Sequence, residues 1–519
     1  MTVTLEHADA PHDPPSPGPA VAGPVRLPAW VAVCAVAVAA AVAWLPALTV
    51  FPSSDEGGFL LVASQWHPGS SLYGDYWVDR PPVLVLLFQL ADQLGGVVPL
   101  RLLGMLAVAV SVLLAAAVPS ALLTPAGSLD RRARAALLTA VTAAALLASP
   151  LFGAMEVDGE LLAVPAVLAG CLLLLRAWRT PGLAQRTVLH GLAGLLGSAA
   201  WMTKQNVIDV FVLGAALSTS AWLSRRRTFG QAFLELAGMA AGLAIGVGGA
   251  LLVAAQHGTS PADLWAAVVT FRLQADGVIA WSSSGATPQR FVMLLGACVL
   301  SAAPAVVWYA VRSLRGTVVR GDAAGEGRPT WPLLALPAWE AVAVGIGGSY
   351  WLHYLLGLVP GIVVLVAAAA SRPTGTRSST HRLAWAVTAA VASSVVAVPV
   401  TASQVPAIRG DDRAVTTYLR EHESPGDTAV VAYGHPDILE EAGLRSPYED
   451  LWSLPVRVRD PHLTRFRHVL ETDRPRWLVT DHGSLRSWGL DTARAQRVVD
   501  RDYLTVFTSG DWSVLERSR

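Results

Sequence analysis

The chain has 519 residues, of which 53% are hydrophobic and only 15% are charged. Apolar runs of about 20 residues recur along it, and each is long enough to cross a bilayer, so an ordinary soluble protein is excluded. The formal net charge is zero, so no overall basic field favours nucleic acid as a partner. Composition therefore predicts a polytopic α-helical membrane protein.

The first 27 residues differ from the rest of the chain. They are rich in proline and polar residues, and they lack the apolar core of a cleavable signal. We expect residues 1–27 to form a disordered cytoplasmic tail. The cysteines Cys34, Cys171 and Cys298 all lie inside apolar runs without metal-binding or disulfide spacing.

Hydropathy predicts about eleven transmembrane helices within residues 28–401. The predicted spans are 29–50, 99–123, 135–152, 160–177, 188–203, 207–223, 230–255, 290–312, 331–348, 351–370 and 383–401. A shorter run at 81–97 contains Asp92 and a glycine pair, so we expect it to lie at the interface.

Every second loop between these spans is rich in arginine. The positive-inside bias assigns those loops to the cytoplasm, which predicts a cytoplasmic N-terminus in the cell membrane. Loops 51–98, 153–159, 204–206, 256–289 and 349–350 then face outside. This alternation requires that 81–97 does not span the membrane.

Residues 402–519 have a different pattern and should form a small extracytoplasmic α/β domain. We expect helical segments at 411–423 and 461–472 and strands at 428–432 and 477–480. A hairpin is expected from 503–507 and 512–515. Four tryptophans in this region could stack on sugars, although burial in a small core is the simpler explanation.

Ionisable and aromatic residues gather at the outer ends of the predicted spans. At such ends, carboxylates and cations can share a cavity without entering the hydrocarbon. The candidates are Asp55, Glu56, Asp75, Tyr76, Asp79, Arg80, Glu156, Asp158, Glu160, Lys204, Gln205, Tyr350, His353 and Tyr354. Moving a sugar from a phosphate carrier needs a carboxylate base and fixed cations for the departing phosphate. Both kinds of residue are present on one predicted face.

Each candidate also has an ordinary structural explanation. Asp55 and Glu56 could cap the helix that follows them. Lys204, the only lysine in the chain, could be a snorkelling anchor, and His353 could be a buried histidine with satisfied hydrogen bonds. The joint occurrence of these residues, rather than any one of them, favours a site.

Several short motifs follow one another in a characteristic order. They are Asp55-Glu56, Leu72-Tyr73-Gly74-Asp75, Asp79-Arg80-Pro81-Pro82, Leu100-Arg101-Leu102, Asp158, Thr203-Lys204 and the YWLHY run from Tyr350 to Tyr354 before Pro360. This series resembles the GT-C glycosyltransferases, particularly the branch of protein O-mannosyltransferases and lipid A aminoarabinose transferases. It covers about residues 29 to 370. Arg80 replaces the usual lysine, which keeps the charge but alters its geometry, and the C-terminal domain carries no motif of a described branch.

The resemblance implies a GT-C-like fold and a function. Such enzymes transfer a sugar from a polyprenyl-phosphate donor, outside the cytoplasmic membrane and with inversion. By position, Asp55 would be the general base on the acceptor, Glu56 a helper or orienting group, and Asp158 a second acceptor-side or base-supporting carboxylate. The acceptor would be an extracytoplasmic glycan, lipid or protein.

Arg80 and Lys204 would hold the carrier phosphate, with Tyr350 and His353 completing the phosphate or sugar side. Further possible substrate contacts are Asp75, Tyr76, Asp79, Glu156, Gln205 and Tyr354.

No obligatory metal is expected, although Asp55, Asp158 and Glu156 could together hold a divalent cation. Two other classes stay open. A secondary transporter or flippase would use carboxylates near mid-bilayer, for which Glu340 and Glu235 are the candidates. A non-catalytic scaffold or sensor with a glycan-binding outer domain is the third reading.

Overall fold

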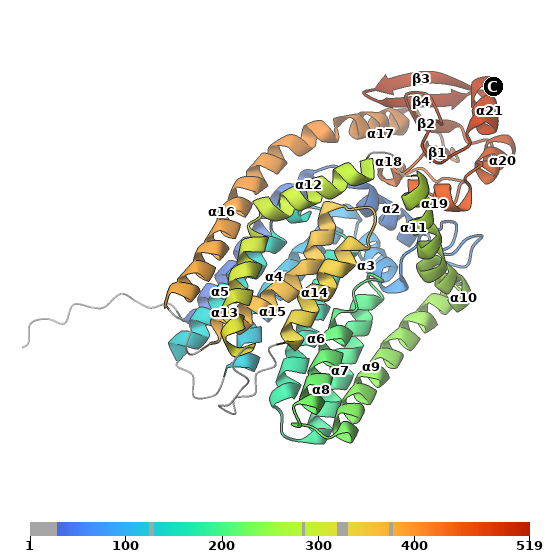
Figure 1. The fold of residues 1–519 in the computed structure, drawn as a ribbon. Helices are drawn as coiled ribbons and strands as arrows, with labels where there is room; N and C mark the ends of the chain where they lie inside the picture. Colours follow the sequence, from blue (N-terminus) through green and yellow to red (C-terminus); the bar gives the residue numbers. More distant parts are fainter. Residues whose placement is uncertain (1–27, 124–128, 283–285, 319–330, 373–376, 519) are drawn as a thin grey trace, which may run out of the picture.

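The computed structural model describes residues 28–123, 129–282, 286–318, 331–372 and 377–518. A helical bundle occupies most of this part of the chain, and a small domain with a β-sheet lies at one end of the bundle (Figure 1). The predicted tail at 1–27 lies outside the described residues, as do Arg320 and Arg328 of one arginine-rich loop.

Helices are present at all eleven predicted spans. They are α1 (Ala29–Val42), α4 (Val97–Leu122), α5 (Leu129–Leu147), α6 (Gly159–Arg179), α7 (Leu183–Trp201), α8 (Asp209–Leu223), α9 (Phe229–Gln256), α12 (Ala286–Leu300), α13 (Ala303–Val318), α14 (Pro332–Gly345), α15 (Val359–Ala370) and α16 (Arg377–Ile408). The predicted span 290–312 is divided between α12 and α13.

Judged by length and composition, fewer helices are able to cross a membrane than the eleven spans that were predicted. Within the described residues, six stretches are long and apolar enough to cross a membrane: Ala29–Thr49, Val97–Leu122, Gly159–Arg179, Phe229–Gln256, Leu352–Ala370 and His381–Gln404. The pair α12 and α13, bent by 60° at a break, would make a seventh. The multi-pass character is therefore supported, whereas the count of eleven is not confirmed.

One end of the bundle is held together by arginines at helix ends. Arg179 donates a hydrogen bond to the carbonyl of Leu123, and Arg227 donates to that of Trp178 at 3.2 Å. Cations near carbonyls at helix C-termini are favourable because they complement the helix dipole. Glu235 was a candidate binding residue for a transporter. It lies 3.4 Å from Arg227, so the charge of this cation balances that of its carboxylate.

The predicted outer loops are largely helical. Loop 51–98 holds α2 (Ser54–Ser64) and α3 (Pro82–Gln93), while loop 256–289 holds α10 (Pro261–Trp265), a π-helix (Ala266–Thr270) and α11 (Phe271–Ser282). Helix α2 begins at a capping box, in which Ser53 and Glu56 each accept a hydrogen bond from the other's amide. Helix α3 falls within the run predicted to lie at the interface, and its position relative to a membrane stays a prediction.

The C-terminal part starts from α16, which continues past the expected boundary at residue 401. It comprises α17 (Gly410–His422), β1 (Ala429–Ala432), α18 (Pro436–Ala442), α19 (Ser453–Arg459), α20 (Thr464–Thr472), β2 (Trp477–Asp481), α21 (Ala493–Asp502), β3 (Tyr503–Ser509) and β4 (Trp512–Arg517). The sheet has the order β1-β2-β4-β3, with β1 and β2 parallel and the other pairs antiparallel. The expected elements are thus present, and α18, α19 and α21 were not predicted.

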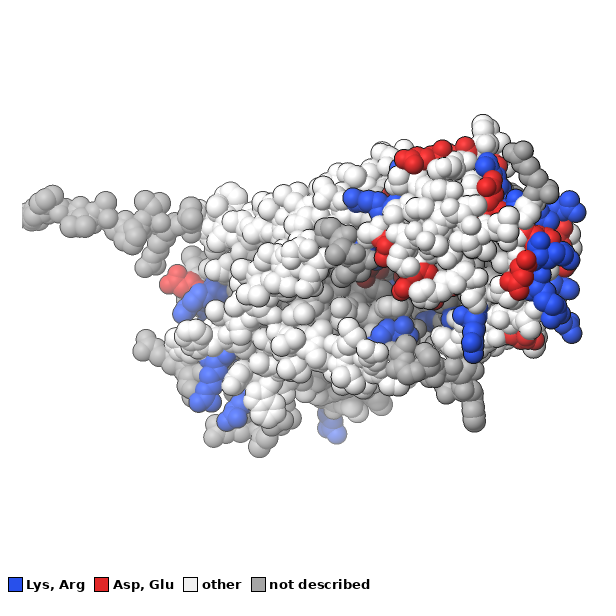
Figure 2. Space-filling view, turned by 90° about the horizontal axis from the view of Figure 1, so that it is seen from above, with Lys and Arg blue, Asp and Glu red and all other residues white. Residues whose placement is uncertain are grey.

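This C-terminal domain packs closely on the loop 51–98, which was predicted to face outside. The amide of Ser446 donates to the hydroxyl of Tyr76 at 3.0 Å. Gly58 lies against the ring of Trp452, where an added Cβ would come within 2.3 Å, so only glycine allows this approach. Figure 2 shows that charged side chains gather mainly at the end that carries this domain, whereas the visible surface of the helices is largely uncharged.

Candidate active site

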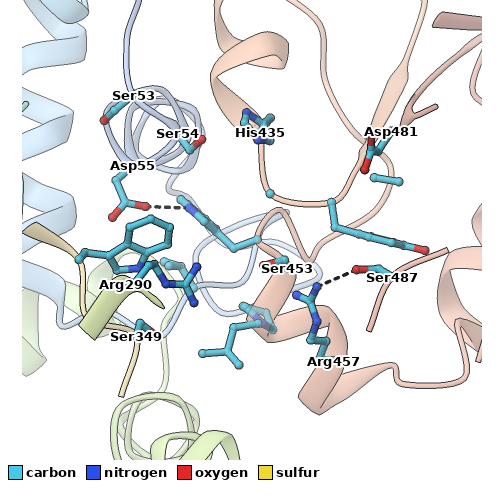
Figure 3. A pocket seen from close by; sticks show the side chains of 18 of the residues that line it. Ser53, Ser54, Asp55, Arg290, Ser349, His435, Ser453, Arg457, Asp481 and Ser487 are labelled. Carbon is cyan, nitrogen blue, oxygen red and sulfur yellow. Dashed lines mark hydrogen bonds between the residues drawn. The ribbon is translucent and has the colours of Figure 1, made fainter. Parts of the chain in front are cut away.

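A cavity of about 830 Å³ lies between the bundle and the C-terminal domain. Its walls come from α2, from residues 78–80 and 156–158, from α11 and α12, from residues 349–354 and from the C-terminal domain (Figure 3). The predicted site residues that line it are Asp55, Asp79, Arg80, Glu156, Asp158, His353 and Tyr354. Residues spread over three hundred positions therefore meet at one cavity, while their chemical roles stay predictions.

Asp55 reaches the cavity from the first turn of α2. Its Oδ1 accepts a hydrogen bond of 3.0 Å from the indole Nε1 of Trp452, which belongs to the C-terminal domain (Figure 3). The ring of Trp452 is held in turn against Phe59, with centroids 5.1 Å apart. The domain therefore fixes the orientation of the carboxylate predicted to act as the base.

Glu56, its neighbour, does not line the cavity. It is fully buried and forms an ion pair of 2.7 Å with Arg101 of α4. Its Oε1 also accepts from the amide of Val157 at 3.1 Å. These contacts tie α2 to α4 and to the segment before α6. The structure therefore places Glu56 where it can orient Asp55 through the helix, without access to a substrate in the cavity.

Two guanidinium groups share one carboxylate in the cavity wall. Arg80 lies 2.7 Å from Oδ1 of Asp79, and Arg272 of α11 lies 3.2 Å from its Oδ2. Burial disfavours the charged form of Arg80, but the carboxylate of Asp79 together with the more distant Asp55, Tyr354 and Glu160 outweighs it and raises the pKa of the guanidinium. The guanidinium also lies over the ring of Phe59, 5.5 Å from its centroid. Arg80 is thus a fixed cation, as binding a phosphate requires.

Glu156, Asp158 and His353 form a second group in the wall. Nδ1 of His353 lies 3.1 Å from Oε1 of Glu156 and 3.5 Å from Oδ2 of Asp158. Asp158 also caps α6, since its Oδ1 accepts from the amide of Leu161 at 2.9 Å. Burial opposes ionisation of Glu156, yet the hydrogen bond to His353 lowers the pKa of its carboxyl group. Burial raises the pKa of Asp158, against the charge of His353.

Lys204 and Tyr350 lie outside the cavity lining. The ammonium group of Lys204 is buried and forms an ion pair of 2.9 Å with Glu160. It also lies over the ring of Tyr354, a residue of the cavity wall, 5.4 Å from the centroid. The hydroxyl of Tyr350 donates to the carbonyl of Gly345.

The remaining predicted contacts support the walls. Tyr76 binds the C-terminal domain, as described above. The amide of Asp75 donates to the side chain of Gln65. The side-chain amide of Gln205 donates to the carbonyl of Asp79 at 3.2 Å. None of these three residues lines the cavity.

The sequence analysis did not predict that the C-terminal domain and the loop 256–289 would contribute residues to the cavity wall. Besides Trp452 and Arg272, the cavity is lined by Arg290 of α12 and Arg457 of α19 (Figure 3). Arg457 donates to the hydroxyl of Ser487 at 2.8 Å and lies over a tryptophan ring. Arg272 could have been predicted from the sequence, because it is the single arginine or lysine in the weakly charged loop 256–289.

No protein-family model and no curated protein sequence matches the chain. Solved structures do match. The structure of ArnT from Cupriavidus metallidurans bound to undecaprenyl phosphate is similar with a TM-score of 0.61 and 14% identity, covering 94% of this chain and 97% of that one. ArnT in the apo state is similar with a TM-score of 0.56, at the same identity and coverage.

Arabinosyltransferase EmbB from Mycobacterium smegmatis is similar with a TM-score of 0.43 and 14% identity. The match covers 94% of this chain and 46% of EmbB. This weaker likeness carries no argument. The two ArnT structures show that this chain shares their fold over 94% of its length, as the resemblance in sequence predicted.

Proposed function

We propose that this protein is a membrane glycosyltransferase that moves a sugar from a polyprenyl-phosphate donor to a hydroxyl group of an extracytoplasmic glycan, lipid or protein. One observation carries the proposal: a candidate base, Asp55, and a candidate phosphate ligand, Arg80, line the same cavity. The shared fold supports it, because ArnT with that fold is bound to undecaprenyl phosphate. The arginine-rich end of the bundle would face the cytoplasm, which puts the cavity outside.

In the proposed reaction, the acceptor hydroxyl donates a hydrogen bond to the carboxylate of Asp55. The hydroxyl oxygen forms a bond to the anomeric carbon while the bond between that carbon and the phosphate oxygen breaks on the opposite face, so the configuration inverts. The proton passes to Asp55, and the electron pair leaves with the polyprenyl phosphate. A positioned base of this kind contributes about 10²–10⁴-fold to the rate.

The departing phosphate gains negative charge, which Arg80 and Arg272 would stabilise. Because Asp79 already holds both guanidinium groups, little reorganisation is needed as the charge develops. His353, held by Glu156 and Asp158, would donate a hydrogen bond to the phosphate or the sugar. In this scheme Asp158 acts through His353.

The test is a membrane assay with radiolabelled polyprenyl-phosphate sugars, comparing the wild type with Asp55→Asn. We expect the variant to bind the donor but to transfer label at least about 10²-fold more slowly, because the base is lost and the size of the side chain is kept. Analysing which lipid or polymer acquires label would identify the acceptor.

Asp130→Asn is the matched control, since Asp130 is exposed on α5 outside the cavity. It should transfer label at the wild-type rate. Transfer by Asp55→Asn at the rate of this control would contradict the assignment of the base and would favour a non-catalytic role.

One observation keeps the transporter alternative in view. The helices α12 and α13 meet at a 60° bend, and broken helices of this kind form the binding sites of many transporters. Against this, Oε1 of Glu340 is already bound to the amide of Gly361 at 2.7 Å. Uptake of lipid-linked sugar into proteoliposomes without transfer to an acceptor would favour transport.

A further inference from the structure

A second cluster of ionisable groups lies on the C-terminal side of the cavity, away from Arg80 and His353. It consists of Asp412 from α17, His435 from the segment before α18, and Asp437 from the first turn of α18. One oxygen or nitrogen atom from each of the three side chains lies within 4.8 Å of the others. Asp412 and His435 line the cavity, and the side chain of Asp437 is fully buried.

The buried atoms of this cluster lack ordinary partners. Among the described residues, neither carboxylate oxygen of Asp437 nor Nδ1 of His435 has a hydrogen bond of normal geometry. The side chain of Ser54 interacts with Asp437, and Nδ1 of His435 lies 3.8 Å from Oδ1 of Asp437. The guanidinium of Arg409 lies 3.8 Å from Asp437 and 3.7 Å from Asp412, which is beyond hydrogen-bonding distance. These contacts with Arg409 balance charge but leave both oxygens of Asp437 without a well-placed hydrogen-bond donor. This is unfavourable for a buried carboxylate, so the arrangement points to a further ligand.

The surrounding contacts orient the cluster. Oδ1 of Asp412 accepts a hydrogen bond of 2.7 Å from Nε1 of Trp512, and the His435 ring packs edge-on against the same indole, with centroids 4.8 Å apart. The carboxylate of Asp412 is thereby fixed, and its Oδ2, which lies 3.7 Å from Arg409, is free of hydrogen bonds of normal length. Orienting contacts of this type are usual around metal-binding side chains.

The group formed by Glu156, Asp158 and His353 differs in this respect. There Nδ1 of His353 is shared with Glu156 at 3.1 Å, and Oδ1 of Asp158 accepts from a backbone amide. Oδ2 of Asp158 has no hydrogen bond, but the imidazole nitrogen that faces the two carboxylates is already shared with Glu156.

We propose that Asp412, His435 and Asp437 bind a divalent metal ion. An imidazole and two carboxylates suit Zn²⁺ best among the common ions, and three protein ligands leave a coordination position for water or a substrate oxygen. Zinc bonds of about 2.0–2.2 Å require the three side chains to draw closer on binding. The ion would join α17, which follows the last membrane helix, to α18 beside the sheet. This inference is independent of glycosyl transfer.

The experiment offers Zn²⁺ alone to the full-length protein, purified in detergent without a polyhistidine tag, and measures bound zinc by mass spectrometry after gel filtration. We expect about one zinc per chain in the wild type. His435→Ala and Asp412→Asn should each lose most of it, since each removes one of three ligands. His353→Ala is the matched control and should retain the zinc.

Two further measurements keep the test decisive if a variant fails to fold. X-ray absorption at the zinc edge of the wild type should show one imidazole and otherwise oxygen ligands, and zinc should raise the thermal unfolding temperature of the wild type. The proposal is overturned if the wild type binds no zinc, if zinc is lost with His353→Ala but not with His435→Ala, or if the spectrum shows two or more imidazoles.

Discussion

The indole of Trp452 donates a hydrogen bond of 3.0 Å to the carboxylate of Asp55, although the two residues are separated by 397 positions in the chain. The cavity is therefore completed by a domain that the motif resemblance does not cover. Trp452 contacts the proposed base itself, and so it is expected to position that base.

The first prediction concerns this contact. Trp452→Phe keeps most of the ring but removes the donor, so the Asp55 carboxylate loses an orienting hydrogen bond. A hydrogen bond to a charged group contributes about 1.5–3 kcal/mol, and we expect kcat to fall by about 10–150-fold with a smaller change in KM for the donor. Trp385→Phe, on the exposed face of α16, is the control. A change in donor KM alone would contradict the positioning role.

The second prediction concerns the ion pair between Glu56 and Arg101. Both side chains are almost fully buried, so Arg101→Met leaves an uncompensated carboxylate and should destabilise the protein by about 3–5 kcal/mol. Thermal unfolding in detergent, followed by tryptophan fluorescence, measures the loss. The double variant Glu56→Gln/Arg101→Met should be more stable than Arg101→Met. Equal instability of the two variants would show that the charge of Glu56 is not the cause.

The third prediction concerns the geometry of Arg80. Arg80→Lys keeps the charge but loses the planar contact with Asp79 and the packing over Phe59. We expect donor turnover within about tenfold of the wild type for Arg80→Lys, and a loss of about 10²–10³-fold for Arg80→Ala. Steady-state assays over a range of donor concentrations measure both. Arg413→Ala, exposed on α17, should behave as the wild type; equal losses for Lys and Ala at position 80 would exclude a simple charge effect.

The fourth prediction separates two roles of Lys204. Its ion pair with Glu160 is buried, so Lys204→Met should lower the stability by about 3–5 kcal/mol. If Lys204 serves the wall and not the phosphate, the double variant Lys204→Met/Glu160→Gln should recover both stability and most of the transfer activity. A stable but inactive double variant would restore Lys204 as a ligand of the donor phosphate.

Much of the framework could be predicted from the sequence. Long apolar runs mark the helices because a bilayer imposes both length and composition. The alternation of arginine-rich loops then places Asp55, Arg80 and Asp158 at one end of the bundle, and the structure brings all three to one cavity.

The roles of adjacent residues were harder to separate. Asp55 and Glu56 differ by one position, which turns their side chains by about 100° around α2 and gives them opposite surroundings. The spacing of Ser53 and Glu56 is the signature of a capping box, so the structural part played by Glu56 was readable from the sequence.

Contacts between distant segments had no local signal. Trp452, Arg457 and the cluster around Asp437 reach the cavity only because the C-terminal domain packs on α2. Neither hydropathy nor helical periodicity predicts that the C-terminal domain packs on α2. The short helices α18 and α19, which carry Asp437 and Arg457, were missed for the same reason.

The pairing of Asp55 with Trp452 also bears on how the protein is made. The ribosome releases the proposed base early and its orienting indole hundreds of residues later. A partly synthesised or truncated chain in the membrane would therefore have the Asp55 carboxylate without the Trp452 indole. Such a chain would consume little of the lipid-linked sugar. Full activity would arise only once the C-terminal domain has folded against α2.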